Sequence, residues 1–369
     1  MPPYFIGLMS GTSLDGVDGV LVNFNGKQPH VLAHHAMPFA PALKRELLAL
    51  NTPSDNELHR AALAANGLVQ VYAQTVQALL NDTHTPASEV GAIGAHGQTV
   101  RHQPGAFDGT GYTLQLNNPA LLAELTGIDV VADFRSRDVA AAGQGAPLVP
   151  VFHQGIFGQT NRTVGVLNIG GIANLSVLHA NGDVLGFDCG PGNALLDHWC
   201  QAHTGYAFDN NGAWGASGTV IEPLLRMMLA EPYLHQVPPK STGRDLFHPT
   251  WLAHQLSGYA NADAADVQAT LTEFTARACV NDVLHHAADA SELIVCGGGA
   301  LNGWLMQRLQ AGLPSVRVLS SAERGMPPLQ VEAAAFAWLA RQTVLGQPGN
   351  LPKVTGAQGA RILGGIFKA

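Results

Sequence analysis

The sequence has few charged residues and carries no dense run of lysine and arginine. Only 12% of its 369 residues are charged, whereas 46% are hydrophobic, and the net charge is −8. A chain this apolar can bury a large core, which excludes general disorder. The missing basic footprint argues against nucleic acid as a partner. It does not exclude an anionic ligand, because backbone N–H groups can bind phosphate locally whatever the total charge.

Cysteine is scarce and scattered. The four cysteines are Cys189, Cys200, Cys279 and Cys296, with no C-x-x-C among them. This excludes a disulfide framework and a clustered zinc site, and it predicts a reducing, cytoplasmic location. No uninterrupted apolar run reaches the ~18 residues of a membrane span. The first residues lack a basic start followed by a long apolar run, so no signal peptide is expected.

Glycine is abundant instead, with 42 residues, and apolar strand patterns alternate with helical ones. The alternation predicts an α/β fold, and the length exceeds the ~250–300 residues at which single cores stop growing, which predicts two domains. Strands are expected at both ends of 4–22 and 163–178, and at 90–95, 128–132, 183–187 and 292–296. Helices are expected within 41–80 and at 119–126, 193–203, 262–288, 301–311 and 331–344.

Two segments share one design. Residues 4–22 and 163–178 each place apolar strands around a glycine-rich turn, at Gly11 and Gly170. They are separated by about one domain's length of chain, which suggests two domains of related topology. Two unrelated β-hairpins would give the same pattern.

The turn at residues 10–18, SGTSLDGVD, combines glycines with hydroxyls and carboxylates. Consecutive N–H groups and hydroxyls can donate to phosphate oxygens. Asp15 and Asp18 are suited to Mg²⁺ held through its waters. The Walker A pattern is absent. Composition alone fits a well-capped turn equally well.

Two further glycine motifs follow strands. Residues 168–174 read NIGGIAN, and Gly297, Gly298 and Gly299 lie between a buried strand and a helix. Bare backbone at a helix start favours an anion or a flat ligand. An ordinary tight turn explains each motif taken alone.

Asp188 ends a buried strand and precedes the rigid turn Gly190-Pro191-Gly192. An acid held in this way is suited to act as a general base, although a capping aspartate would look the same. His96 and Arg135 also follow short buried strands, where polar groups can face a ligand. A structural histidine and a surface ion pair are the alternatives for these two.

Together these segments resemble the anhydro-N-acetylmuramic acid kinase family along nearly the whole chain. Ala142 stands where that family's pattern has glycine. The matching blocks, in order from Ile6, are IGLMSGTSLDGVDGVLV, GAHGQTVRH, DFRSRDVAAAGQGAPLVP, LNIGGIANLSVL, GFDCGPGNALLD, PPKSTGRDLF, VCGGGALN and VEAAAFAWLA, followed by VTGA near the C-terminus.

The resemblance implies an actin-like, sugar-kinase-type fold (the ASKHA, ribonuclease H-like class), with ATP in a cleft between two α/β domains. The expected domains are residues 1–140 with the tail 346–369, and residues 141–345. A homodimer is also implied, and Asp15 and Asp18 are the expected Mg²⁺ ligands, through water. The implied ATP-binding residues are Gly11, Thr12, Ser13, Leu14, Asp15, Gly16, Val17, Asp18, Gly170, Gly171, Asn174, Gly297, Gly298 and Gly299. The implied sugar contacts are His96, Gln98, Arg135 and Glu332.

The implied reaction converts 1,6-anhydro-N-acetylmuramic acid, a product of cell-wall turnover, to N-acetylmuramic acid 6-phosphate. In the anhydro sugar O6 is an ether oxygen and has no proton for a base to remove. The resemblance therefore assigns Asp188 to a water that attacks C1 while O6 attacks the γ-phosphate of ATP. Two alternatives stay open: an ordinary sugar kinase acting on a free hydroxyl, and a non-catalytic actin-like ATP-binding protein.

Overall fold

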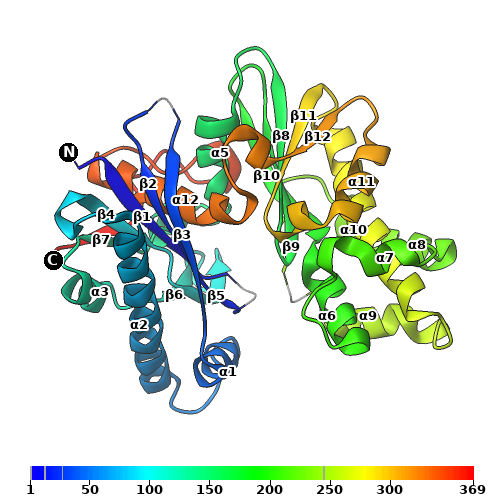
Figure 1. The fold of residues 1–369 in the computed structure, drawn as a ribbon, viewed down its shortest axis with the longest axis horizontal. Helices are drawn as coiled ribbons and strands as arrows, with labels where there is room; N and C mark the ends of the chain where they lie inside the picture. Colours follow the sequence, from blue (N-terminus) through cyan, green and yellow to red (C-terminus); the bar gives the residue numbers. More distant parts are fainter. Residues whose placement is uncertain (1, 12–13, 27, 244–245) are drawn as a thin grey trace. The chain divides into compact units, whose positions relative to one another are not determined.

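The computed structural model describes residues 2–11, 14–26, 28–243 and 246–369 (Figure 1). It divides into two compact units. Unit 1 comprises Met1–Phe152 and Gln330–Ala369, and unit 2 comprises His153–Leu329. In the described part of the chain, no helix is long and apolar enough to cross a membrane.

Unit 1 is built on a mixed sheet of order β13-β7-β4-β1-β2-β3. The first three strands form an antiparallel meander, while β4 and β7 run parallel to β1. A separate hairpin of β5 and β6 follows β4. The strands are β1 (Tyr4–Met9), β2 (Gly16–Asn23), β3 (His30–Pro38), β4 (Val90–Ala95), β5 (Gln98–Pro104), β6 (Gly111–Leu116), β7 (Val130–Ala132) and β13 (Gly365–Phe367).

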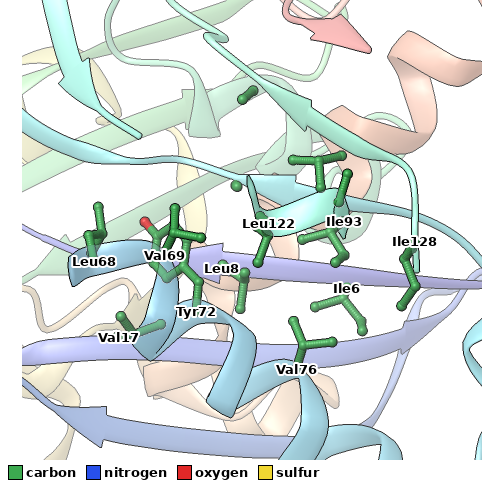
Figure 2. Packing of buried hydrophobic residues seen from close by; sticks show 14 of the residues in the cluster. Ile6, Leu8, Val17, Leu68, Val69, Tyr72, Val76, Ile93, Leu122 and Ile128 are labelled. Carbon is green, nitrogen blue, oxygen red and sulfur yellow. The ribbon is translucent and has the colours of Figure 1, made fainter. Parts of the chain in front are cut away.

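Helices cover both faces of this sheet. The helices are α1 (Pro41–Ala49), α2 (Glu57–Thr83), α3 (Pro119–Thr126), α4 (Ser136–Ala140), α5 (Val149–Phe157, which spans the unit boundary), α12 (Val331–Val344) and α13 (Pro352–Thr355). Ile6 and Leu8 of β1 lie on the face covered by α2, where they pack with Tyr72 and Val76 (Figure 2). Alternate residues of a strand face opposite sides, so Gly7 faces α12.

The position of α12 follows from two glycines. A Cβ added to Gly7 would lie 1.8 Å from the carbonyl oxygen of Ala333, and one added to Gly94 would lie 2.1 Å from that of Phe336. Only glycine permits such a close approach of a helix backbone to a strand. The expected domains had placed residues 141–152 and 330–345 in the second domain. The structure places them in unit 1. Helix α12 packs directly on β1 and β4, and the segment after α4 bonds to the C-terminal tail, with the Gln144 N–H donating to the Thr355 carbonyl at 2.7 Å.

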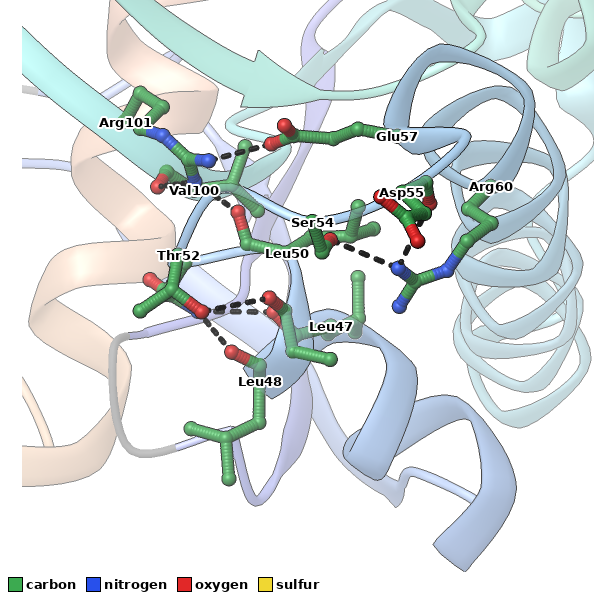
Figure 3. Close-up of polar contacts among 12 residues, drawn as sticks. Leu47, Leu48, Leu50, Thr52, Ser54, Asp55, Glu57, Arg60, Val100 and Arg101 are labelled. Carbon is green, nitrogen blue, oxygen red and sulfur yellow. Dashed lines mark hydrogen bonds and ion pairs between the residues drawn. The ribbon is translucent and has the colours of Figure 1, made fainter.

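The connection between α1 and α2 is fastened by arginines (Figure 3). Arg101 of β5 donates to the Leu50 carbonyl and to the Glu57 carboxylate. Arg60 donates to Ser54 Oγ at 2.8 Å. The helical pattern expected within 41–80 is therefore two helices, with Pro53 in the connection, where it cannot continue a helix.

Unit 2 repeats the topology of unit 1. Its sheet has the order β10-β9-β8-β11-β12. The first three strands are again an antiparallel meander, and β11 and β12 run parallel to β8. This matches β3-β2-β1-β4-β7 strand for strand, so the predicted two-domain α/β fold of related halves is confirmed. The strands are β8 (Thr163–Ile169), β9 (Ile172–Leu178), β10 (Val184–Pro191), β11 (Ala290–Cys296) and β12 (Arg317–Ser320).

The central helix of unit 2 is α10, which is buried along most of its length. It begins after Asp263, whose carboxylate caps the helix by accepting from the N–H of Ala265 at 2.8 Å. The helices of unit 2 are α6 (Asn193–Thr204), α7 (Ala213–Ser217), α8 (Glu222–Leu229), α9 (Pro249–Gln255), α10 (Ala264–His286) and α11 (Gly303–Gly312), with 3₁₀ turns η3 (Pro232–His235) and η5 (Gly298–Leu301).

Candidate active site

The β1–β2 turn of unit 1 carries the first predicted phosphate motif. The N–H of Leu14 donates to the Gly11 carbonyl at 3.2 Å, and Leu14 has φ +58°. Thr12 and Ser13 lie outside the described residues. Gly16 and Val17 begin β2, where a Cβ on Gly16 would lie 2.2 Å from the Met37 carbonyl oxygen. Glycine is therefore required at residue 16 for packing against β3, independently of any ligand.

The two carboxylates of this turn each have a basic neighbour. Asp15 Oδ1 accepts from Lys44 Nζ at 3.0 Å, and Asp18 Oδ1 lies 3.1 Å from His34 Nε2. Asp15 is the more exposed, at 76% of its side chain. Mg²⁺ usually keeps several waters and takes one or two carboxylates plus phosphate oxygens, and exposed Asp15 fits that requirement. The described residues contain no group of three or more metal-ligating side chains.

The end of β1 is bonded to the turn after β4. Ser10 Oγ donates to the Gly97 carbonyl at 3.1 Å, and the Gly97 N–H donates to the Tyr72 hydroxyl at 3.0 Å. Gln98 Nε2 donates to the Gly11 carbonyl at 3.1 Å. Ser10, Tyr72 and Gln98 are all buried. These hydrogen bonds connect the predicted phosphate-binding turn at residues 10–18 to the predicted sugar-binding turn at residues 96–98.

His96 and Arg135, two of the predicted sugar contacts, bond to each other. Arg135 donates to His96 Nε2 from Nε at 3.2 Å and from Nη2 at 3.0 Å, and to the Gly145 carbonyl at 2.8 Å. Burial, assisted by the Arg135 charge, lowers the pKa of His96 to about 3. The imidazole is therefore neutral, with its proton on Nδ1, since Nε2 is the acceptor.

Glu332 completes this group from α12. Burial lowers the pKa of Arg135 to about 10, and the carboxylates of Glu332 and Asp138 oppose that shift. The guanidinium remains charged at neutral pH. The structure therefore brings His96, Arg135 and Glu332 together, with Gln98 in the adjoining turn, although they come from segments far apart in the sequence.

Asp188 lies near the end of β10 in unit 2. Its Oδ2 accepts from Ser241 Oγ at 2.9 Å and from the Thr242 N–H at 3.0 Å. Its backbone is bonded as well: the N–H donates to the Lys240 carbonyl at 3.2 Å, and the carbonyl accepts from the Tyr233 hydroxyl at 2.8 Å. Burial raises the pKa of Asp188, opposed by the two donors and by the Lys240 charge. A half-buried carboxylate with a raised pKa is suited to accept a proton.

The glycine motifs of unit 2 lie against one another. Asn193, the first residue of α6, donates its N–H to the Gly170 carbonyl at 2.7 Å. A Cβ on Gly297, where φ is +76°, would lie 2.5 Å from Asn168 Oδ1, and one on Gly298 would lie 3.2 Å from Asn193 Nδ2. Asn174 pairs with Asp188 across β9 and β10. Gly170, Gly297 and Gly298 thus lie near the start of α6, which follows β10, and Asn174 lies beside Asp188.

Comparison with known proteins identifies the chain. Residues 3–369 match the family model of anhydro-N-acetylmuramic acid kinase. The chain belongs to this family. It is 63% identical to the anhydro-N-acetylmuramic acid kinase of Variovorax paradoxus (strain S110) over 370 residues, which is 99% of each chain. It is 61% identical to that of Albidiferax ferrireducens over the full length of both.

Solved structures are more distant from this kinase-family chain. The activator of the 2-hydroxyisocaproyl-CoA dehydratase from Clostridium difficile, with bound ADPNP, aligns with a TM-score of 0.49 at 14% identity, covering 93% of this chain and 96% of that one. A ROK family glucokinase from Streptomyces griseus aligns with a TM-score of 0.42 at 15% identity, covering 92% and 99%.

Three residues of this kinase-family chain that touch Asp188 were not assigned a role from sequence. Lys240, Ser241 and Thr242 lie in the block PPKSTGRDLF, which was recognised only as part of the family pattern. Tyr72 lies within the helical segment expected in 41–80, and no role at the site was predicted for it. A lysine followed by two hydroxyl residues after a Pro-Pro pair was the available signal, but nothing in its spacing points to β10.

Proposed function

We propose that this chain converts 1,6-anhydro-N-acetylmuramic acid, ATP and water to N-acetylmuramic acid 6-phosphate and ADP. Membership of the kinase family over residues 3–369 carries the proposal. The reaction returns a peptidoglycan sugar to metabolism, so we infer a cytoplasmic enzyme. A homodimer is inferred from the family resemblance.

Asp188 acts as the base in this proposal. It accepts a proton from a water molecule as the water oxygen forms a bond to C1 of the sugar. The C1–O6 bond breaks, and the electron pair stays on O6. O6 then forms a bond to the γ-phosphorus, and ADP leaves. The raised pKa of Asp188 supports this role, because it makes the carboxylate a stronger base than an exposed aspartate.

The other residues bind and orient. We propose that Gly11 to Asp18, Gly170, Gly171, Asn174 and Gly297 to Gly299 bind ATP through backbone N–H groups and close approach. Asp15 and Asp18 would hold hydrated Mg²⁺, which supplies charge neutralisation on the phosphates when bound. The planar guanidinium of Arg135, which bonds to His96 and is influenced by the charge of Glu332, is suited to recognise sugar oxygens or a carboxylate.

Isotope labelling tests the proposal. The protein is incubated with Mg-ATP and the anhydro sugar in ¹⁸O-water, and the product is analysed by mass spectrometry. The coupled reaction requires one ¹⁸O at C1 of a 6-phosphorylated sugar. Phosphorylation of ordinary hexoses without the anhydro sugar would support a kinase for free hydroxyls, and ATP binding without any sugar phosphate would support the non-catalytic alternative.

The role of Asp188 is tested separately. Asp188→Asn keeps the acceptor for Ser241 and Thr242 but cannot take a proton. We expect turnover to fall by a factor of about 10² to 10⁴, with ATP affinity unchanged by calorimetry. Near-normal turnover of this variant would remove Asp188 from the base role.

A further inference from the structure

Lys240 is a buried lysine, and burial of its ammonium group is costly unless the charge is paired. Its side chain is 1% exposed and its partner Asp282, on α10, is 9% exposed. Lysine is almost never fully buried unless it is paired. Here Nζ donates to Asp282 Oδ1 at 3.1 Å and to the Leu234 carbonyl at 3.4 Å.

The same ammonium group lies over two aromatic rings. Nζ is 5.5 Å from the ring centroid of Phe187 and 5.4 Å from that of Tyr233. Both residues belong to the surroundings of Asp188: Phe187 precedes it in β10, and the Tyr233 hydroxyl donates to its carbonyl. Cations are attracted to aromatic faces at such distances, so both rings stabilise the Lys240 ammonium in addition to Asp282.

The backbone of Lys240 continues directly into the residues that hold Asp188. The Lys240 carbonyl accepts from the Asp188 N–H, and the next two residues donate to Asp188 Oδ2. Fixing the Lys240 side chain therefore fixes the carboxylate. An apolar residue of similar size would fill this volume at no desolvation cost, and buried ion pairs are often replaceable by apolar residues without loss of stability. Stability alone does not explain a charge at this position.

We propose that Lys240, paired with Asp282, is a positioning residue for the reaction. It holds the segment 240–242 against Asp188 and supplies a positive charge near that carboxylate. This inference rests on the proposed role of Asp188. It assigns no contact between Lys240 and substrate.

The charged and titratable groups around Asp188 indicate how loss of the Lys240 charge would change the pKa of Asp188. Among the described residues, Lys240 is the charged group that acts on its carboxylate, and it lowers the pKa of Asp188 against the effect of burial. The neighbouring titratable groups are Tyr233 on η3, Cys189 on β10, and Cys279, Asp282 and His286 on α10. Burial, Cys279 and Asp282 raise the pKa of Cys189 well above its usual value, so that thiol is uncharged near neutral pH.

The test compares three variants over a pH series. Lys240→Met removes the charge and keeps an unbranched side chain one atom shorter. Lys240→Met with Asp282→Asn removes the charge without leaving a buried carboxylate unpaired. Lys368→Met, whose side chain is 77% exposed in an ion pair with Asp129, is the matched control. For each variant the steady-state rate constants, the pH profile of kcat and the thermal midpoint are measured.

A positioning role predicts a specific combination of results. The double variant recovers the thermal midpoint lost in Lys240→Met, yet both variants show the acidic limb of kcat shifted upward by about one pH unit. On that limb kcat falls about tenfold, with KM for both substrates within about twofold. Lys368→Met retains the wild-type profile.

One outcome overturns this inference, and it is distinguishable from failure of the proposed function. If the double variant recovers both the thermal midpoint and the wild-type pH profile, Lys240 is only part of the fold. If Lys240→Met fails to fold, the double variant alone decides. A fully active Asp188→Asn would instead refute the role of Asp188 itself.

Discussion

The Tyr72 hydroxyl lies 3.1 Å from Ser10 Oγ and accepts the N–H of Gly97. Since Ser10 uses its proton on the Gly97 carbonyl, Tyr72 donates to Ser10, and each of the three groups is satisfied. Tyr72 is fully buried on α2, and this burial raises its pKa to about 12. One phenol thus joins the helix to both turns of the candidate site in unit 1.

Removing this hydroxyl is expected to loosen both turns. Tyr72→Phe leaves the buried Gly97 N–H without its acceptor, which costs about 1–3 kcal/mol of unfolding free energy. We expect KM for ATP and for the sugar to rise together, because both turns lose the same support. Urea unfolding and steady-state kinetics measure the two effects.

Tyr206→Phe is the matched control, because Tyr206 is 74% exposed. It should leave both the unfolding free energy and the kinetics unchanged. If Tyr72→Phe were destabilised but kinetically normal, the hydroxyl would serve folding alone.

Ala142 departs from the family pattern at a position with a backbone requirement. Its φ is +63°, in the left-handed region, and the side chain is exposed. A non-glycine residue there is disfavoured by roughly 1–2 kcal/mol, while glycine costs about 0.4–1 kcal/mol in the unfolded chain. Ala142→Gly should therefore raise the unfolding free energy by about 0.5–1 kcal/mol.

The same substitution in a helix should act in the opposite direction. Ala62 is exposed on α2, and Ala62→Gly should lower the unfolding free energy by about 1 kcal/mol. Chemical denaturation of both variants provides the comparison. Equal destabilisation by the two would contradict the left-handed backbone at Ala142.

Local signals in the sequence were sufficient for many elements. The Asn118-Pro119 start predicted α3 with the bounds that the structure has, and the apolar runs at 90–95 and 331–344 gave β4 and α12. Pro53 interrupts the helical pattern expected within 41–80, and the chain there forms two helices. The strands β3, β5 and β6 were not predicted; β3 and the β5–β6 hairpin are only partly buried and carry many polar residues, so neither produces a strong apolar pattern.

Long-range contacts were beyond the reach of the sequence. The helical period of 331–344 could not indicate which sheet α12 covers. That depends on Gly7 and Gly94, whose lack of a side chain lets the α12 backbone pack closely against β1 and β4. Likewise Asp188 was singled out from its own strand and turn, whereas the residues that hold it come from a segment about 50 positions later. Hydrogen bonds between distant loops leave no periodic trace.

Arg135 is expected to be intolerant even of lysine. Its guanidinium reaches His96 and Gly145 at once, and a lysine ammonium cannot reproduce this planar fork. Arg135→Lys should raise KM for the anhydro sugar about tenfold or more, because one charge-assisted hydrogen bond is lost. KM for ATP should change little. Arg317→Lys, at an exposed ion pair with Glu323, is the control for the chemical change. A selective rise in KM for ATP would reverse the assignment.

His153 makes stability depend on pH. It is 1% exposed, its Nδ1 lies 2.9 Å from Ser176 Oγ, and burial lowers its pKa to about 3. The unfolded state, with a pKa near 6.5, binds this proton more tightly, so the stabilisation is complete above about pH 6.5 and is lost as pH falls toward 3. One such proton makes the unfolding free energy change by up to about 1.4 kcal/mol per pH unit.

His153→Gln should be less stable at neutral pH and should reduce the pH dependence of the unfolding free energy between pH 6 and 4. Replacing exposed His30 by Gln should leave that pH dependence unchanged. Urea unfolding at several pH values measures the slopes, and identical slopes for His153→Gln and wild type would show that His153 is protonated as easily in the folded state as in the unfolded one.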